Sequence, residues 1–229
     1  MEIYDRFVTL GGLRFHYREV GDPQCHPAVL LHALGAGCSD WDQVARALAP
    51  EHRVLAFELR GSFASPRTER YSFELMRDDA RDFADEMGLH RFSLIGHSMG
   101  GTVAYLFAEE WPERLDRLVI EDTPPPLQGW YRPVPDGEPP PDLPFDVEMG
   151  RAIMRQLNEP DPAWWERLPE ITVPTLLIAG GQDSHMAQEE LVEVARRIPS
   201  CRLIDLGGGH SVHTERRGEF VAAVRNFLG

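Results

Sequence analysis

The sequence predicts an α/β protein built on a mostly parallel, eight-stranded sheet with helices on both faces. Short apolar runs alternate along the chain with helical patterns, as expected for strands joined by crossover helices. The segment Gly96-His97-Ser98-Met99-Gly100 lies between an apolar run and a helix-like run, which is the context of a sharp strand-to-helix corner. A chain of 229 residues is also long enough to bury one sizeable core.

An opening β-hairpin and six later strands make up the predicted sheet. Residues 7–10 and 13–19 alternate with period two and are joined by Gly11-Gly12, which predicts the hairpin. The later strands are predicted at residues 28–32, 54–59, 92–95, 118–121, 175–179 and 202–206. Helices are predicted between them, at about residues 41–48, 73–87, 102–110, 188–198 and 218–227.

One region interrupts this alternation. Residues 123–174 contain 13 of the 19 prolines and show no strand pattern, so the first part of this region is expected to be extended and loop-like. Two short helices are predicted at residues 147–157 and 162–168. We therefore expect one domain over residues 1–229 with an insertion at about residues 124–170; a disordered linker is the alternative for the proline-rich part.

Composition narrows the function classes. The net charge of -14, without a cluster of basic residues, argues against nucleic acid or anionic lipid as a partner. No run is long and apolar enough to span a membrane, and the amino terminus lacks a secretory pattern. Three scattered cysteines predict no disulfide framework and favour a cytoplasmic location. Nothing in the sequence indicates the oligomeric state.

The order of three polar residues predicts nucleophilic catalysis. Ser98, Asp183 and His210 each follow a predicted strand, in that order along the chain. A serine hydroxyl needs an imidazole to take its proton, and His210 is the candidate base. Asp183 is the candidate carboxylate that orients this imidazole. His213, three residues beyond His210, is the competing base.

These motifs resemble those of the α/β-hydrolase family, and the resemblance covers nearly the whole chain. The triad order matches, residues 30–35 are similar to the family's His-Gly loop, and residues 59–61 are similar to its Arg-Gly loop. Ala33 and Phe63 stand where the family usually has glycine. The resemblance implies that the proline-rich insertion is a short cap between strands six and seven. Some members place the acid after strand six, which makes Glu121 and Asp122 rivals of Asp183.

The resemblance also implies the surroundings of the nucleophile. The backbone amides of Leu34 and Met99 would form the oxyanion hole. His32 and His97 are expected to hydrogen-bond loops behind the nucleophile. The large apolar side chains that could wall the substrate pocket, or serve only packing, are Trp41, Phe63, Trp130, Tyr131, Trp164 and Trp165.

No cofactor or metal ion is expected. His210 and His213 form a pair without the third and fourth ligands of a zinc site, and Gly207-Gly208-Gly209 is not followed by the lysine and serine of a phosphate loop.

The expected function is a cytoplasmic serine hydrolase that cleaves carboxylic esters of small or medium-sized acyl groups through an acyl-enzyme. Serine at the nucleophile position argues against the haloalkane dehalogenase and epoxide hydrolase branches, which attack with aspartate. Lactonase, thioesterase, carbon-carbon hydrolase and perhydrolase activities stay open. So does a ligand receptor or signalling protein of the same fold with very slow turnover.

Overall fold

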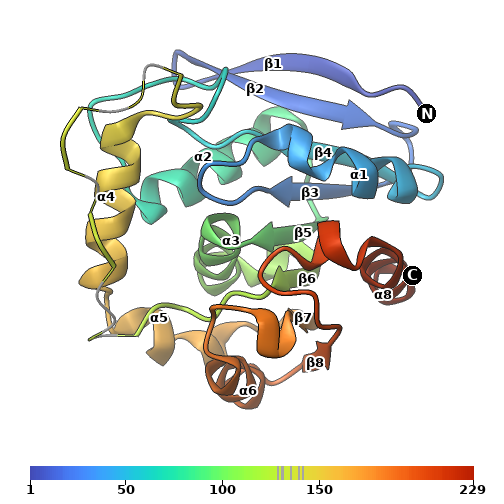
Figure 1. The fold of residues 1–229 in the computed structure, drawn as a ribbon. Coiled ribbons are helices and arrows are strands. Elements are labelled where there is room, and N and C mark those ends of the chain that lie inside the picture. Colours follow the sequence, from blue (N-terminus) through green and yellow to red (C-terminus); the bar gives the residue numbers. More distant parts are fainter. Residues whose placement is uncertain (128, 130–131, 135, 139, 141) are drawn as a thin grey trace.

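The computed structural model describes all residues from 1 to 229 except 128, 130, 131, 135, 139 and 141. In the described part, eight strands form one sheet in the order β1-β2-β4-β3-β5-β6-β7-β8 (Figure 1). The strands are β1 (Tyr4–Leu10), β2 (Leu13–Val20), β3 (His26–Leu31), β4 (His52–Phe57), β5 (Phe92–His97), β6 (Leu115–Glu121), β7 (Thr175–Ala179) and β8 (Cys201–Asp205). β2 is antiparallel to both β1 and β4, whereas every pair from β4 to β8 is parallel.

Helices cover both faces of the sheet, as the alternation of patterns predicted. On one face, α2 (Phe73–Glu86), α3 (Met99–Glu110) and α6 (Gln188–Arg197) contribute to the larger apolar core. On the other face, α1 (Asp42–Leu48) and α8 (Arg217–Leu228) pack on a second core. β3, β4, β5 and β6 are almost completely buried because both of their faces are covered. The predicted fold class is confirmed.

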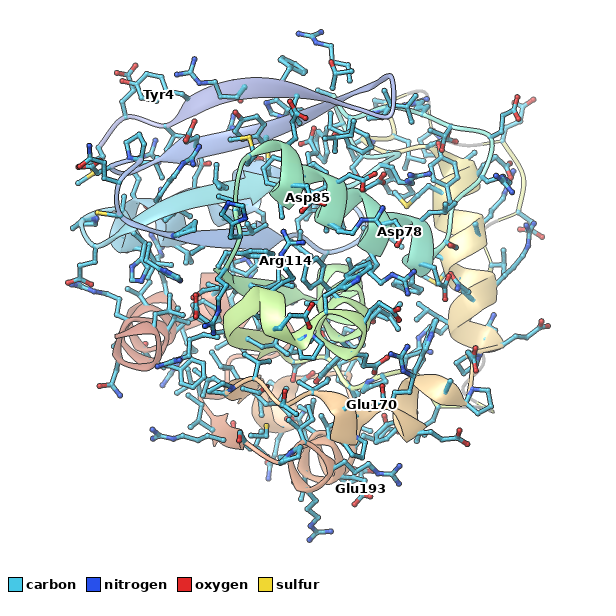
Figure 2. All side chains as sticks on the ribbon, turned by 180° about the vertical axis from the view of Figure 1, so that it is seen from behind. Tyr4, Asp78, Asp85, Arg114, Glu170 and Glu193 are labelled. Carbon is cyan, nitrogen blue, oxygen red and sulfur yellow. The ribbon has the colours of Figure 1, made fainter. Side chains whose placement is uncertain are left out.

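Figure 2 shows the molecule from behind, on the side of α2 and the short 3-10 helix η2 (Pro112–Arg114). Arg114 joins these two elements through an ion pair of 2.7 Å with Asp85. No helix among the described residues has the length and apolar character needed to cross a membrane. Cys25, Cys38 and Cys201 are free thiols, in agreement with the prediction that no disulfide framework is present.

The insertion between β6 and β7 contains the helices that the sequence predicted. α4 (Val147–Asn158) is followed by α5 (Ala163–Glu166) and by the 3-10 helix η3 (Leu168–Glu170). Asp146 caps the N-terminus of α4, where its side chain accepts a hydrogen bond from the amide of Glu148. α4 lies beside the N-terminus of α2 (Figure 1). There, Gln156 accepts a hydrogen bond from the amide of Phe73 and donates one to the carboxylate of Glu74.

Ala33 and Phe63 stand in two loops where glycine was expected, and their backbone conformations differ. Phe63 keeps a glycine-like backbone, with φ of 39°, and its amide donates to the carbonyl of Pro144 at 2.7 Å. Its side chain remains half exposed. Ala33 has no positive φ, so this loop needs no glycine at that position. Both loops are therefore compatible with the side chains that the sequence places there.

Candidate active site

Ser98 occupies the corner between β5 and α3. Its backbone has φ of 52° and ψ of -117°, a conformation that residues other than glycine rarely adopt. Its amide donates to Oγ1 of Thr123 at 2.8 Å, which holds the corner against the end of β6. A Cβ atom on Gly96 would collide with the backbone of Gly100, which explains why the corner needs glycine there. The sequence prediction for Ser98 thus agrees with a strained, strand-to-helix turn.

His210 receives its carboxylate partner from the end of β6. Nδ1 of His210 lies 2.9 Å from Oδ2 of Asp122, whose side chain is completely buried. Asp122 also has a positive φ, of 44°, so its backbone shares the unusual geometry of Ser98. The ring of His210 is contacted by those of His97 and His185, at centroid distances of 4.7 and 4.4 Å.

Asp122 is held in its ionised form by several donors. Burial by itself would raise its pKa, but hydrogen bonds from His210, Ser184 and Gly180 outweigh burial and lower the pKa. The Gly180 amide lies 2.8 Å from Oδ1, and Nε2 of Gln188 lies 3.1 Å from the same atom. The Ser184 hydroxyl donates to Oδ2. These donors fix the carboxylate in position against His210.

The structure does not place Asp183 where the sequence analysis expected it. Asp183 lies in the 3-10 helix η4 (Gly181–Asp183) and is exposed, and no hydrogen bond or ion pair among the described residues joins it to His210. The chain turns after β7 so that Ser184, one residue later, faces Asp122. The prediction that Asp183 orients His210 is wrong in this structure, and the rival at the end of β6, Asp122, takes that position. Adjacent parallel strands end at one edge, so either strand can supply the acid.

His213, the competing base, is enclosed in a separate network. Its Nδ1 lies 2.9 Å from each carboxylate oxygen of Glu121, and its Nε2 lies 3.1 Å from Oδ2 of Asp40. Burial would lower the pKa of His213, but the hydrogen bonds with Asp40 and Glu121 raise it to about 9. Both ring nitrogens are occupied, so this imidazole is not placed to accept a proton from Ser98.

The two predicted oxyanion donors lie beside Ser98. Leu34 and Met99 line the same pocket as the serine. Met99 is the first residue of α3, where backbone amides have no acceptor within the helix. Oγ of Ser98 and Nε2 of His210 have no hydrogen-bond partner in the described part of the chain, which leaves both free to contact a ligand. Such contacts commonly form only when substrate is bound.

The pocket at Ser98 has a volume of about 440 Å³ and a mostly apolar wall. Ile153, Met154 and Leu157 of α4 form one side of it, and Phe73 of α2 forms another. His185 lines the pocket and contacts the ring of His210, which places the candidate base at its edge. Ser98 and His185 both line this pocket, so His210 lies next to one of its lining residues.

The aromatic residues that the sequence proposed for this pocket lie elsewhere. Trp41 is fully buried on the opposite face of the sheet, 4.5 Å from the ring of His213. Trp164 packs edge-on behind Phe73, at 5.5 Å. Phe63 does not line the pocket either, and Trp130 and Tyr131 are outside the described residues. Trp41, Phe63, Trp164 and Trp165 are thus absent from the described lining of this pocket, the packing alternative describes Trp41 and Trp164, and α4 supplies one wall instead.

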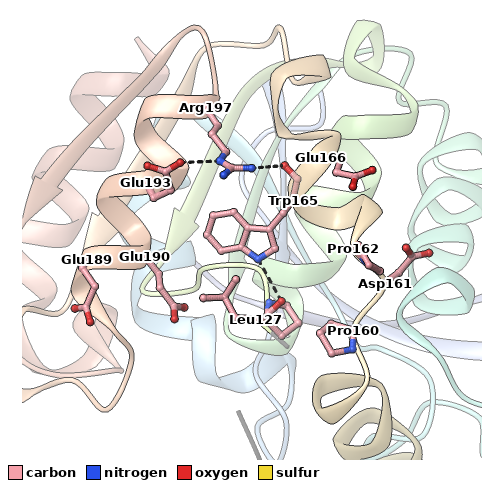
Figure 3. Close-up of a pocket in the computed structure, with 11 residues that line it drawn as sticks. Leu127, Pro160, Asp161, Pro162, Trp165, Glu166, Glu189, Glu190, Glu193 and Arg197 are labelled. Carbon is pink, nitrogen blue, oxygen red and sulfur yellow. Dashed lines mark hydrogen bonds and ion pairs between the residues drawn. The ribbon is translucent and has the colours of Figure 1, made fainter. Parts of the chain in front are cut away.

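Trp165 instead forms part of a second cavity, of about 620 Å³, between α5 and α6 (Figure 3). Its indole donates to the carbonyls of Pro125 and Pro126, and Arg197 bridges Glu193 and the Trp165 carbonyl. No serine, threonine, cysteine or histidine is among the described residues that line this larger cavity. These described lining residues therefore offer no hydroxyl or thiol nucleophile and no imidazole base, and the smaller cavity at Ser98 is the better candidate active site.

His32 and His97 have the supporting positions that the sequence analysis expected. Nδ1 of His32 lies 2.8 Å from the carbonyl of Ala33, and its Nε2 accepts from the amide of Leu59 at 3.1 Å, so the ring joins two loops. Nε2 of His97 lies 2.8 Å from the carbonyl of His210. It therefore fixes the backbone of the loop that carries the candidate base.

The chain is similar to several known proteins. The chain is 27% identical to a putative 2-succinyl-6-hydroxy-2,4-cyclohexadiene-1-carboxylate synthase of Bacillus subtilis, with 95% of each chain covered. It is 25% identical to esterase YbfF of Escherichia coli, covering 88% of this chain and 92% of the esterase. The crystal structure of an enol-lactonase from Burkholderia xenovorans superimposes with a TM-score of 0.86 at 22% identity, covering 97% and 99%.

The family model described as "Alpha/beta hydrolase family" matches residues 28–224. This range includes the strands β4 to β8, the insertion, and the candidate residues Ser98, Asp122 and His210. The relatives with stated activities include esterases, lipases and epoxide hydrolases. The protein is therefore a member of the α/β-hydrolase family, and several of its relatives are hydrolases.

Proposed function

We propose that this protein is a serine hydrolase that cleaves carboxylic esters of small or medium-sized acyl groups through an acyl-enzyme. One observation carries the proposal: a buried carboxylate, Asp122, holds His210 beside the pocket that also contains the strained Ser98. A nucleophile, a base and a third group that orients the base are the elements of this chemistry.

Each group has a defined role in the proposed reaction. Ser98 Oγ attacks the carbonyl carbon of the ester while Nε2 of His210 takes the hydroxyl proton. Asp122 keeps the proton of His210 on Nδ1 and stabilises the imidazolium, and its lowered pKa keeps it ionised. The amides of Met99 and Leu34 would stabilise the oxyanion. His210 then gives its proton to the departing alcohol, and water attacks the acyl-enzyme by the same route.

The pocket supports a substrate with a compact apolar acyl group. A volume of about 440 Å³ admits a small molecule, and the side formed by Ile153, Met154 and Leu157 suits a hydrocarbon group, while Arg132 also lines the pocket. The larger second cavity is bordered by the carboxyl groups of Asp161, Glu166, Glu189, Glu190 and Glu193, which makes it a poor site for an ester's apolar portion.

Covalent labelling tests the nucleophile directly. A fluorophosphonate should add once per chain, and peptide mapping should find the label on Ser98. Ser98→Ala should lose the label and about a millionfold in turnover while keeping its melting temperature, because removing a triad nucleophile has effects of this size. Ser39→Ala, an exposed serine on the loop after β3, is the control and should label normally. A label on any other serine contradicts the assignment.

A panel of p-nitrophenyl esters of rising chain length, with a lactone and an acyl thioester added, tests the substrate class. The proposal predicts turnover of many per second on short and medium esters, with a decline for longer chains. Turnover slower than about one per minute on all of them, with saturable ligand binding, would favour a receptor of the same fold. Preference for the lactone or thioester would keep the mechanism but change the substrate class.

A further inference from the structure

Three residues from distant parts of the chain meet behind the candidate active site. Asp40 belongs to the 3-10 helix η1 (Cys38–Trp41), His97 is the last residue of β5, and His213 lies in α7 (Val212–Glu215). One side-chain ligand atom of each lies within 4.8 Å of those of the other two. The sequence analysis found no further ligands for His213 near it in the chain, because these partners come from positions 40 and 97.

His97 has a nitrogen without a partner. Its Nε2 hydrogen-bonds the carbonyl of His210 at 2.8 Å, so the ring carries its proton there and Nδ1 presents a lone pair. Nδ1 is buried and has no hydrogen-bond partner within the described residues, and the side chain as a whole is 2% exposed. A buried polar atom left unpaired is costly, and a bound ion would remove that cost.

His213 is oriented as metal-binding histidines are. Its Nδ1 is held by Glu121, a completely buried carboxylate, and this leaves Nε2 facing Oδ2 of Asp40 at 3.1 Å. Metal-ligating histidines usually give their second nitrogen to a carboxylate or a backbone carbonyl. His213 has the first kind of partner and His97 the second.

We propose that His97 Nδ1, His213 Nε2 and an Asp40 carboxylate oxygen form a binding site for one borderline divalent metal ion, for which zinc has the best-matched chemistry. Two imidazoles and one carboxylate suit Zn²⁺ and its neighbours in the first transition series, with water completing the coordination. Ligand atoms about 2.0–2.1 Å from a tetrahedral ion are about 3.3 Å apart, close to the 3.1 Å between His213 and Asp40. The other separations are no more than 4.8 Å, so binding would bring these ligand atoms closer together.

The site has both an entry route and a consequence for the neighbouring loops. The Asp40 side chain is 37% exposed, so an ion can reach it from solvent, whereas that of His213 is 1% exposed. On binding, the ion replaces the proton between Nε2 of His213 and Asp40, and this proton passes to solvent. The ion would join the loop after β3, the residue before Ser98 and the helix after His210, and so stiffen the three segments that carry the candidate catalytic groups.

A second cluster offers ligands of metal-binding types but lacks the unpaired atom. His16, Cys38 and Glu58 are all buried, and they hydrogen-bond one another at 3.0 to 3.5 Å. Nε2 of His16 is also occupied, by Asp5 at 2.9 Å. Its polar atoms are therefore satisfied without an ion, and it serves as the competing location in the test.

The experiment measures metal binding to the full chain directly. Chelator-treated protein is titrated with Co²⁺ while its visible absorption is recorded, and is separately dialysed against Zn²⁺ before elemental analysis. We expect one equivalent of either ion, Co²⁺ d–d bands without an intense thiolate charge-transfer band, and a raised melting temperature in excess Zn²⁺. These readouts do not depend on hydrolytic activity.

Matched variants locate the ion. Asp40→Asn changes an exposed side chain and should weaken binding at least about tenfold; Asp42→Asn, two residues away, should bind as the wild type does. Cys38→Ser should also bind normally. Less than one tenth of an equivalent in the wild type, unchanged binding in Asp40→Asn, or a thiolate band that Cys38→Ser abolishes would each overturn the proposal, the last by placing the ion in the second cluster.

Discussion

The end of β6 carries two adjacent carboxyl groups that face two different histidines. Asp122 pairs with His210, which keeps 19% of its side chain exposed and has a free Nε2 at the edge of the pocket. Glu121 pairs with His213, and both of these side chains are almost completely buried. A carboxylate–imidazole pair thus yields an imidazole open to a ligand in one case and an enclosed one in the other. Burial and the occupancy of the second ring nitrogen distinguish them.

Breaking the pair at the pocket should have the largest effect. Asp122→Asn should lower turnover on a short p-nitrophenyl ester by about four orders of magnitude, because an amide no longer holds His210 in the required tautomer. Asp183→Asn is the matched control and should stay within about twofold of the wild type, because Asp183 is exposed and does not contact the base. Collapse of Asp183→Asn with an active Asp122→Asn would return the acid to η4.

A third buried carboxyl group, Glu109 in α3, shows what happens without a partner. Neither of its oxygens has a hydrogen-bond partner among the described residues, and burial raises its pKa to about 8. The unfolded chain releases this proton near pH 4.5, whereas the folded chain keeps it until about pH 8. The free energy of unfolding therefore falls as pH rises across this window.

Glu109→Gln should remove that dependence. Each unit of pKa shift is worth about 1.4 kcal/mol, so the variant should be more stable than the wild type by about 4 kcal/mol at pH 8 and should show no such gain at pH 4. Urea unfolding at the two pH values measures this difference. Glu110→Gln, next in sequence and exposed, is the control. An equal change at both pH values would show that the pKa of Glu109 is the same in the folded and the unfolded chain.

Breaking the enclosed pair should affect stability more than chemistry. Glu121→Gln removes the buried one of the two carboxylates that contact His213 and should lower the free energy of unfolding by about 3 kcal/mol. Turnover of the folded protein should stay within about tenfold of the wild type, because Glu121 does not contact His210 in the described structure. Denaturant unfolding measures the change in stability, and kinetics normalised by active-site titration measure the change in turnover. A loss of turnover as large as that of Asp122→Asn would show that the Glu121–His213 pair matters for catalysis as much as the Asp122–His210 pair does.

The smallest expected effect sharpens the comparison at the pocket. Ser184→Ala removes a hydroxyl donor from Asp122 but leaves the donors Gly180 and Gln188 in place. Turnover should fall about tenfold, the size expected for one hydrogen bond to a charged group. The acidic limb of the pH–rate profile should also move, whereas Ser39→Ala should leave the profile unchanged. No change in either quantity would mean that the other donors alone hold the carboxylate.

Local sequence patterns predicted much of the fold. The hairpin at Gly11-Gly12, the strands and the two helices of the insertion agree with the sequence predictions to within a few residues, because period and turn residues act over short distances. The Ser98 corner was readable for the same reason, since its glycines and its flanking elements are contiguous. Local patterns did not predict packing partners. The sequence did not indicate that Trp41 lies on the opposite face of the sheet from the pocket.

By itself, the sequence determined which residue types stand at the ends of the strands. It supplied a serine after β5, a histidine after β8 and acids after both β6 and β7. Only the tertiary structure decided which acid meets the histidine, because parallel strands end at one edge and the choice depends on the turn that follows each strand. Asp122 folds inward with a positive φ, whereas Asp183 is turned outward. The partners of His213 likewise come from positions 173 and 92 residues away, a separation that no local pattern encodes.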